Sequence, residues 1–391
     1  MSIIEPIKVA YLDYSHVFAG AEQVLHTIIS SIDRRKVTPY LVFPYPQDHH
    51  ERYMQLDCEK KWLFDEKEWW MGSERWKHPV RGSDFFARFI WGVKLAAYLK
   101  SNDIKILHIN LLRPDCMMWV LPSHMAGVKI IGHFRSQELD WIPSRRVQKL
   151  FNLILCVSKF SQSRFLCKGR FIPTRYLYDS INMGKFNIDL DKIQALNDLG
   201  YSENTILISS VGQLSSHKGH DNAIRAFIKI ASKYPQARLL IAGNGVCLEQ
   251  LKKLAKQTEY AERIDILGRQ VSNISQIYKA SSLILSLTKV GEGFGLVPYE
   301  AALHGCPFIA PNFGAVKEFV ESGKNGILVD THDIEEIVEA IDWSLSNQSE
   351  AIDLINMLKK KIYQELTPKR MCEELVEVYQ SIINQYSLNE D

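Results

Sequence analysis

Short apolar segments alternate with segments of helical spacing along nearly the whole chain. The apolar segments are rich in Val, Ile and Leu and run continuously, which is typical of strands that a parallel sheet buries on both faces. Five precede residue 160 and six follow residue 204: IKVAYLDY, PYLVFPY, IKILHIN, VKIIGHF and LILCVS, then TILISSVG, ARLLIAG, RIDILG, LILSLT, CPFIAP and GILVD. We therefore predict an α/β protein with two doubly wound, Rossmann-like domains.

The segments between the predicted strands carry the spacing of amphipathic helices. One of them has apolar residues at Ile224, Phe227 and Ile228, and we expect Asp221 to be its N-cap. Another follows Pro368 and ends the chain. Its apolar positions are Met371, Leu375, Val378 and Ile382.

A polar stretch without a strand signal, residues 180–204, separates the two sets of apolar segments. Because domain boundaries fall in such stretches, we place the boundary near residue 185. The predicted domains are 1–185 and 186–365, and 366–391 forms a final helix that needs a partner surface. Residues 44–84 show no clear period, so we interpret them as an insertion or a long loop.

Composition narrows the class of protein. The 391 residues are 46% hydrophobic and 24% charged, as in an ordinary globular protein. The formal net charge of +2, without a block of Lys and Arg, argues against nucleic acid as a partner. Seven scattered cysteines include no CxxC pair, so neither a disulfide framework nor a zinc site is indicated, and a reducing cytoplasm fits best. The N-terminal MSIIEPIKVAYLDYS lacks the apolar core of a signal peptide, and no apolar run reaches 18 residues.

The segment EGFGLVPYE, Glu292 to Glu300, carries the clearest chemistry. It follows the apolar segment LILSLT, and Pro298 fits the first turn of a helix that stops at Gly305. A strand, a glycine loop and a helix N-terminus together form an anion site, since glycines let the backbone approach a phosphate. Carboxylates repel phosphate, so the two glutamates are better suited to the hydroxyl groups of ribose and of a second sugar. A nucleotide sugar satisfies both.

Residues 205–330 resemble the C-terminal half of a family 4 glycosyltransferase with the GT-B fold. The motifs that carry the resemblance are VGQLSSHKGHDNAIRAF, LLIAGNGVCLEQL, IDILGRQV and EGFGLVPYEAALHGCPFIAPNFGAVKEFVESGKNGILVD. The last contains the E-x7-E signature of that family. The N-terminal half is similar more faintly, through FAGAEQVL, GHF and CVS.

The resemblance implies two domains that face each other across a cleft, with the donor bound mainly by the C-terminal one. Glu300 would hold the ribose, Glu292 the donor sugar and Lys218 the diphosphate. The diphosphate oxygens would also be bound by the loop backbone, at Gly295, Leu296 and Val297.

Further roles follow from the same resemblance. Arg269 would lie near the base, Gly20 of the N-terminal domain near the phosphate or the acceptor, and His133 near the reacting carbon of the donor sugar. The final helix would pack back on the N-terminal domain.

The chain departs from the family at Gln213, where an Arg is usual, so one cation opposite the leaving group is missing. His217, Arg269 and Arg135 are the substitutes we consider. It departs again at Asp179 and Ser180, where Asn-Gly is more common.

The expected activity is that of a retaining, metal-independent hexosyltransferase without a cofactor. It would move a sugar from a nucleoside diphosphate, UDP by preference, to a hydroxyl of a glycan, lipid or small-molecule acceptor held by the N-terminal domain. A cytoplasmic location is expected, with peripheral membrane contact through that domain as an option. Two alternatives remain open: an epimerase or hydrolase of nucleotide sugars on the same fold, and a non-catalytic binder silenced by Gln213.

Several other motifs have a plain structural interpretation that we prefer. GNGVCLE, residues 243–249, lacks the third glycine of a dinucleotide fingerprint and is interpreted as a turn. DLD, residues 189–191, is interpreted as a helix cap, and QDHHE, residues 47–51, as a polar loop. Residues 85–100 fit a core helix better than the membrane-surface helix of relatives that glycosylate lipids. Four tryptophans, at 62, 69, 70 and 76, are either an acceptor wall or ordinary packing.

Overall fold

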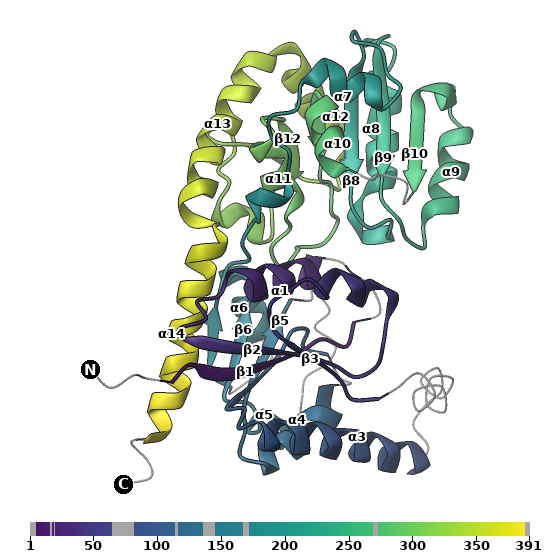
Figure 1. Cartoon of the computed structure of the whole chain (residues 1–391). Helices are drawn as coiled ribbons and strands as arrows, with labels where there is room; N and C mark the ends of the chain where they lie inside the picture. The colour runs from purple at the N-terminus through teal and green to yellow at the C-terminus, as the bar shows by residue number, and fades with distance from the viewer. Residues whose placement is uncertain are drawn as a thin grey trace. The chain divides into compact units, whose positions relative to one another are not determined.

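The computed structural model divides the chain into two compact units. Unit 1 comprises Met1–Ser180 and Pro368–Asp391, and unit 2 comprises Ile181–Thr367 (Figure 1). The structure describes residues 5–15, 18, 20–64, 82–113, 116–135, 145–166, 172–268 and 273–387.

Unit 1 contains a parallel sheet with strand order β3-β2-β1-β4-β5-β6-β7. Val9 of β1 pairs with Pro39 of β2 on one side and with Ile106 of β4 on the other, so the strand order reverses between β1 and β4. The strands are β1 (Ile7–Leu12), β2 (Val37–Phe43), β3 (Glu59–Trp62), β4 (Ile106–Ile109), β5 (Lys129–Phe134), β6 (Leu153–Cys156) and β7 (Thr174–Tyr176).

Helices cover both faces of this sheet, and each face has its own hydrophobic core. One core joins the sheet to α3 and α4 through Leu95, Leu99 and Trp119. The other joins it to α1 and α14, where Leu375 and Tyr379 are fully buried. The helices are α1 (Gly20–Ser31), α3 (Gly82–Ser101), α4 (Met117–Met125), α5 (Arg145–Gln148), α6 (Lys159–Leu166) and α14 (Pro368–Ser387).

Unit 2 repeats the design with strand order β10-β9-β8-β11-β12-β13, again all parallel. The strand order reverses at β8 and β11. The strands are β8 (Ile206–Val211), β9 (Ala237–Ala242), β10 (Ile264–Gly268), β11 (Leu283–Leu285), β12 (Phe308–Pro311) and β13 (Ile327–Val329). The helices are α7 (Lys192–Asp198), α8 (His220–Ile230), α9 (Leu248–Lys256), α10 (Ile274–Ala280), α11 (Val297–Leu303), α12 (Ile334–Ser346) and α13 (Gln348–Glu365).

The described part of the segment 44–84, which we interpreted as an insertion or a long loop, contains regular structure. It contains a 3-10 helix, Asp48–Tyr53, and the edge strand β3. The motif QDHHE is not simply a polar loop, because His50 is buried and its ring stacks on Phe43 with centroids 3.8 Å apart. Trp62 donates its indole N–H to His50 Nδ1 at 3.3 Å, which is ordinary packing. Trp69, Trp70 and Trp76 lie outside the described residues.

Helix caps and turns follow the sequence predictions in part. Asp191 caps α7, since its carboxylate accepts from the backbone N–H of Gln194 at 2.9 Å. Residues 243–247 of GNGVCLE form the predicted turn, and its last two residues begin α9. The predicted N-cap of α8 is wrong: Gly219 occupies that position with φ of 73°, and Asp221 instead accepts from Lys289 Nζ at 2.7 Å. Among the helices in the described part of the chain, none is long and apolar enough to cross a membrane.

Candidate functional site

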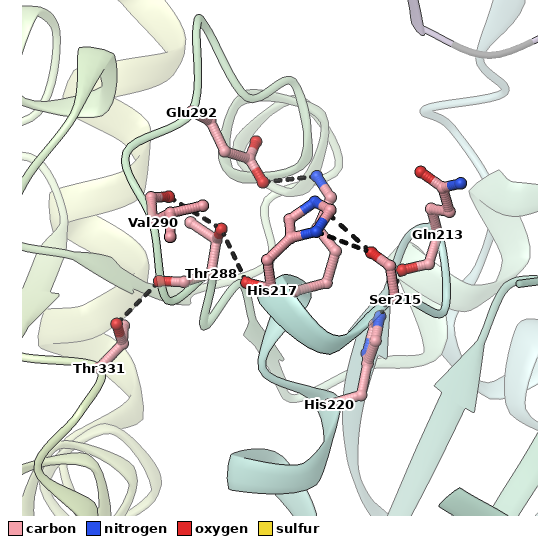
Figure 2. A network of polar contacts seen from close by, with 9 residues as sticks. Gln213, Ser215, His217, His220, Thr288, Val290, Glu292 and Thr331 are labelled. Carbon is pink, nitrogen blue, oxygen red and sulfur yellow. Dashed lines mark hydrogen bonds and ion pairs between the residues drawn. The ribbon is translucent and has the colours of Figure 1, made fainter. Parts of the chain in front are cut away.

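The candidate site of unit 2 lies at the carboxyl ends of β8 and β11, where the strand order reverses. Ligands of doubly wound domains bind at this point because the loops from the two strands diverge there. The loop after β8 carries Gln213, Ser215 and Lys218, and the loop after β11 carries Glu292 (Figure 2).

An ion pair joins these two loops. Lys218 Nζ donates to Glu292 Oε1 at 2.5 Å, and the two side chains are 26% and 16% exposed. Figure 2 shows the Glu292 carboxylate with a dashed line to its partner. Lys218 ends a short 3-10 helix, Ser216–Lys218, and the chain then turns at Gly219. Glycine is required there, because a Cβ would stand 1.8 Å from the carbonyl oxygen of Leu287. The Lys-Gly sequence thus holds the ammonium group against the second loop.

The glycine loop brings its own backbone against Glu292. Gly295 has a φ of 77°, and a Cβ on it would lie 2.7 Å from Glu292 Oε2. Gly314, in the loop after β12, has a φ of 84° and approaches Gly291 so closely that its Cβ would lie 3.1 Å from the Gly291 Cα. Small residues at these positions therefore fix where the carboxylate can sit.

Backbone carbonyls anchor the two loops to each other. The carbonyl of His217 accepts from Thr288 Oγ1 at 3.1 Å and from the Lys289 backbone N–H at 2.7 Å. Thr331 Oγ1 donates to the carbonyl of Thr288 at 2.8 Å (Figure 2). These hydrogen bonds hold the two loops in a fixed arrangement around the Lys218–Glu292 ion pair.

The buried side chain of His220 contacts the loop after β8. Its Nε2 lies 3.1 Å from the carbonyl oxygen of Gln213, and its Nδ1 lies 2.9 Å from Ser210 Oγ. A carbonyl only accepts, so the proton of the neutral ring is on Nε2. The Ser210 hydroxyl donates to the carbonyl of Leu285 at 3.0 Å. Burial lowers the pKa of His220 to about 4, which keeps the ring neutral. The side chain of Gln213 itself is exposed.

Glu300 stands in the first turn of α11. Tyr278 donates its hydroxyl to Glu300 Oε2 at 2.6 Å, and no other described side chain occupies the second oxygen. Burial raises the pKa of Glu300, while the Tyr278 hydrogen bond and the charge of Lys185 oppose that shift. His304 donates from Nδ1 to the carbonyl of Glu300 at 2.7 Å and stacks on Tyr278 with centroids 5.2 Å apart. The carboxylate is therefore held in one orientation with one oxygen free to accept.

In unit 1, His133 lies near the carboxyl end of β5 and is 1% exposed. Its Nδ1 faces Arg135 Nη2 at 3.1 Å and His108 Nε2 at 3.2 Å. Its Nε2 is buried and has no hydrogen-bond partner among the described residues. Gly20 is the first residue of α1, and a Cβ on it would meet no atom of the described residues within 4 Å.

Comparison with known proteins identifies the second unit. Residues 191–364 match the model of a family described as glycosyl transferases group 1. Unit 2 is a group 1 glycosyltransferase domain.

Two solved structures share the fold of the whole chain: Anabaena Alr3699/HepE with UDP and glucose, and WaaG, a glycosyltransferase involved in lipopolysaccharide biosynthesis. The first has 19% identity and a TM-score of 0.79 over 96% of this chain and all of that one. The second has 14% identity and a TM-score of 0.70 over 95% and 99%. The predicted GT-B fold of two doubly wound domains is thereby confirmed.

Curated relatives are also glycosyltransferases by name. An uncharacterized glycosyltransferase of Methanocaldococcus jannaschii, MJ1607, is 29% identical over 209 residues, which are 52% of this chain and 53% of the relative. An uncharacterized glycosyltransferase of Haemophilus influenzae is 37% identical over 152 residues, 39% of this chain and 42% of the relative. The chain therefore matches about half the length of these two. The N-acetyl-alpha-D-glucosaminyl L-malate synthase of Bacillus anthracis is 22% identical over 311 residues, 74% of this chain and 78% of the relative.

The glycosyltransferase domain thus brings together Lys218 and Glu292, and it places Glu300 on the helix that follows their loop. Leu296 precedes α11 and Val297 begins it. Arg269 lies outside the described residues. The guanidinium of Arg135, one of the substitutes considered for the missing cation, is already bonded inside unit 1. Sequence analysis missed Tyr278 and His220, since a lone Tyr or His in a helix gives no signal of what it contacts.

Proposed function

We propose that this chain is a retaining glycosyltransferase that takes its sugar from a nucleoside diphosphate, without a metal ion or another cofactor, and gives it to a hydroxyl group of a glycan, lipid or small molecule. The observation that carries the proposal is the Lys218–Glu292 pair at the reversal point of a group 1 glycosyltransferase domain. The family 4 signature of the sequence is consistent with this function.

Each residue has a role that its contacts support. The Lys218 ammonium has three N–H donors, so it can bond the diphosphate while it keeps Glu292. Glu292 orients that ammonium through Oε1 and accepts from a hydroxyl of the donor sugar through Oε2. Glu300, fixed by Tyr278, accepts from the ribose with its free oxygen. As the bond to the sugar breaks, negative charge grows on the leaving diphosphate, and a fixed cation lowers the energy of that state.

Residues of unit 1 complete the proposal. The free N–H of buried His133 suits an oxygen of the donor sugar, because an unpaired buried donor is costly until an acceptor binds. The open backbone at Gly20 suits a phosphate or an acceptor. The backbone at Gly295, Leu296 and Val297 would bind phosphate oxygens.

UDP is the nucleotide that we propose for the donor. Alr3699/HepE has been solved with UDP-glucose, which supports this choice. GDP is the alternative, since mannosyltransferases of Mycobacterium tuberculosis that depend on GDP-mannose are 23% identical over 66% of this chain.

Nucleotide titration tests the donor site directly. We expect UDP, GDP or ADP to bind the full chain with micromolar affinity in a calorimeter, with or without Mg²⁺. Lys218→Ala should weaken that binding by about 10- to 100-fold, because a charge-assisted hydrogen bond contributes roughly 1.5–3 kcal/mol. Glu300→Gln should weaken it by a similar factor. Lys324→Ala is the matched control, since Lys324 is an exposed lysine of unit 2 paired only with Glu321. A wild-type chain that binds none of the nucleotides would contradict the proposal.

A non-catalytic binder is a second candidate, favoured by the exposed Gln213 where the family usually has Arg. The two candidates differ in turnover. A screen of donor sugars with the nucleotide that binds, followed by product analysis with and without acceptors, separates transfer from hydrolysis and from binding alone. Activity that appears only after Gln213→Arg would establish the binder.

A further inference from the structure

A chain of buried hydrogen bonds in unit 1 runs from the last helix to His133. Tyr379 of α14 places its hydroxyl 2.6 Å from His108 Nδ1, and His108 Nε2 lies 3.2 Å from His133 Nδ1. The hydroxyl of Tyr11 lies 3.1 Å behind that of Tyr379. All four side chains are at most 1% exposed. Such a chain has a direction, because each bond needs one donor and one acceptor.

Arg135 sets that direction. Its Nη2 points at His133 Nδ1 from 3.1 Å, and a guanidinium can only donate. His133 Nδ1 must therefore carry the lone pair, and the single proton of the neutral ring is on Nε2. His108 then has to donate from its Nε2, since two lone pairs cannot face each other at 3.2 Å.

The guanidinium of Arg135 is locked in place by three acceptors. Nη1 forms an ion pair with Asp179 Oδ1, and Nε donates to the carbonyl of Asn110 at 3.1 Å. The Arg135 and Asp179 side chains are only 5% and 11% exposed, so solvent offers no alternative partner. Burial raises the pKa of Asp179, and the charge of Arg135 opposes that shift.

Other charged and titratable groups surround the same cluster. Asp13 at the end of β1 interacts with Arg135, and Glu22 of α1 interacts with Asp13. Burial, the charge of Arg135 and the neighbouring His108 all hold the pKa of His133 well below its usual value. Burial lowers the pKa of His108 to about 3. Both rings are therefore neutral at physiological pH, and the tautomer is the property left to determine.

We propose that Arg135, anchored by Asp179, is a positioning residue that keeps the proton of His133 on Nε2, so that His133 acts only as a hydrogen-bond donor and never as a base. The atom that it presents suits an oxygen acceptor, either a sugar hydroxyl or a phosphate oxygen. The identity of that ligand rests on the proposed function, whereas the position of the proton does not.

Nitrogen NMR of the full chain labelled with ¹⁵N-histidine tests the proton position without any ligand. The His133 signals are assigned by their loss in His133→Gln. We expect the wild-type ring to show a protonated Nε2 and a bare Nδ1, unchanged between pH 8 and pH 5.5. A protonated Nδ1, or a ring that gains a second proton in this range, would overturn the proposal.

Two variants identify which residue is responsible. Arg135→Met combined with Asp179→Asn removes both charges without leaving one of them buried alone, and we expect His133 then to populate the other tautomer or to titrate. Tyr379→Phe is the control, because it removes the far end of the chain and keeps Arg135; His133 should stay protonated on Nε2. An unchanged tautomer in the double variant, or a switch in Tyr379→Phe, would show that Arg135 does not set it. If the double variant does not fold, the wild-type and Tyr379→Phe spectra still decide.

An activity assay tests the donor role. The amide nitrogen of Gln can occupy the place of His Nε2, whereas that of Asn occupies the place of Nδ1. His133→Gln should therefore lose less than about tenfold in affinity for the nucleotide sugar or in transfer rate, and His133→Asn about 100-fold or more. Equal losses, or the reverse order, would overturn the donor role. If the wild-type chain neither binds nor transfers a nucleotide sugar, the proposed function fails and the NMR result stands by itself.

Discussion

At the scale of single residues, unit 1 buries acidic groups at the carboxyl end of its sheet. Asp13 is 1% exposed; its Oδ2 accepts from the Tyr53 hydroxyl at 2.9 Å and its Oδ1 from the Ser15 N–H at 3.2 Å. Burial and the neighbouring Glu22 raise the pKa of Asp13 to about 7. The folded protein therefore takes up a proton near neutrality that the unfolded chain takes up only near pH 4.

This linkage predicts how stability changes with pH. A carboxyl group whose pKa is higher in the folded protein than in the unfolded chain stabilises the fold at a pH below its pKa in the unfolded chain. That stability is lost as the pH rises through its pKa in the folded protein. With a folded pKa of about 7, Asp13 should cost the wild-type chain about 2–3 kcal/mol of unfolding free energy between pH 5 and pH 8. Asp13→Asn should remove this loss, as measured by urea unfolding at both pH values.

Asp33→Asn provides the control for this prediction. Asp33 is paired with Arg35, which lowers the pKa of Asp33 to about 2, so the residue does not titrate between pH 5 and pH 8. Its substitution should leave the pH dependence as in the wild type. Parallel curves for the wild type and Asp13→Asn would contradict the raised pKa.

The sequence indicated which residues to consider for the site but not how they contact one another. Spacing and resemblance singled out Lys218, Glu292 and Glu300, but no pattern indicated that the first two form an ion pair. The suggestion that Arg135 replaces the missing cation is untested, although its guanidinium already has partners from three separate parts of the chain. Only the folded sheet brings Asn110, His133 and Asp179 to one guanidinium.

At the scale of elements, the glycine loop of unit 2 yields a matched pair of substitutions. Gly295 and Gly305 have φ values of 77° and 72°, so alanine at either costs roughly 1–2 kcal/mol of backbone strain. Only Gly295→Ala also places a Cβ 2.7 Å from Glu292 Oε2, while the space at Gly305 is open. We expect both variants to lose similar thermal stability, but only Gly295→Ala to lose nucleotide affinity, by about tenfold or more, in calorimetry. An equal loss of affinity in both would show that Glu292 is not confined by the loop.

The two strands that the sequence did not reveal lie at the edges of the unit 1 sheet, whereas the edge strands β10 and β13 of unit 2 were predicted from RIDILG and GILVD. Central strands such as β1 and β8 have continuous apolar runs because helices cover both faces. The edge strands β3 and β7 have the sequences EKKW and TRY, and every residue in them is exposed or half-buried. Such strands leave no apolar run to recognise. The N-cap of α8 was mispredicted because the chain uses a left-handed glycine, Gly219, in place of a capping side chain.

At the scale of the whole molecule, α14 completes unit 1 rather than unit 2. Leu375 is fully buried in the core that α14 shares with α1, whereas Glu373 on the same helix is exposed. Leu375→Ala should cost about 2–5 kcal/mol, and Glu373→Ala less than about 0.5 kcal/mol. Hydrogen exchange followed by mass spectrometry should show lost protection in α1 and β1 and unchanged protection in unit 2. A uniform loss over both units would mean that they unfold together.

Unit 1 consists of two segments of the chain with unit 2 between them, so it can complete its folding only after unit 2 has been synthesised. Unit 2 is one uninterrupted stretch, and its two ends are tied by the Ile181 N–H donating to the carbonyl of Leu366 at 2.9 Å. It can reach its final form as soon as it has left the ribosome. The nascent N-terminal part waits for α14 while Ile181–Thr367 is translated, roughly 10–40 s at 5–20 residues per second. Throughout that time the apolar surface that α14 later covers is open to solvent. The part of unit 1 that precedes unit 2 in the chain is therefore made before unit 2 but protected after it, and it is the part most in need of a chaperone.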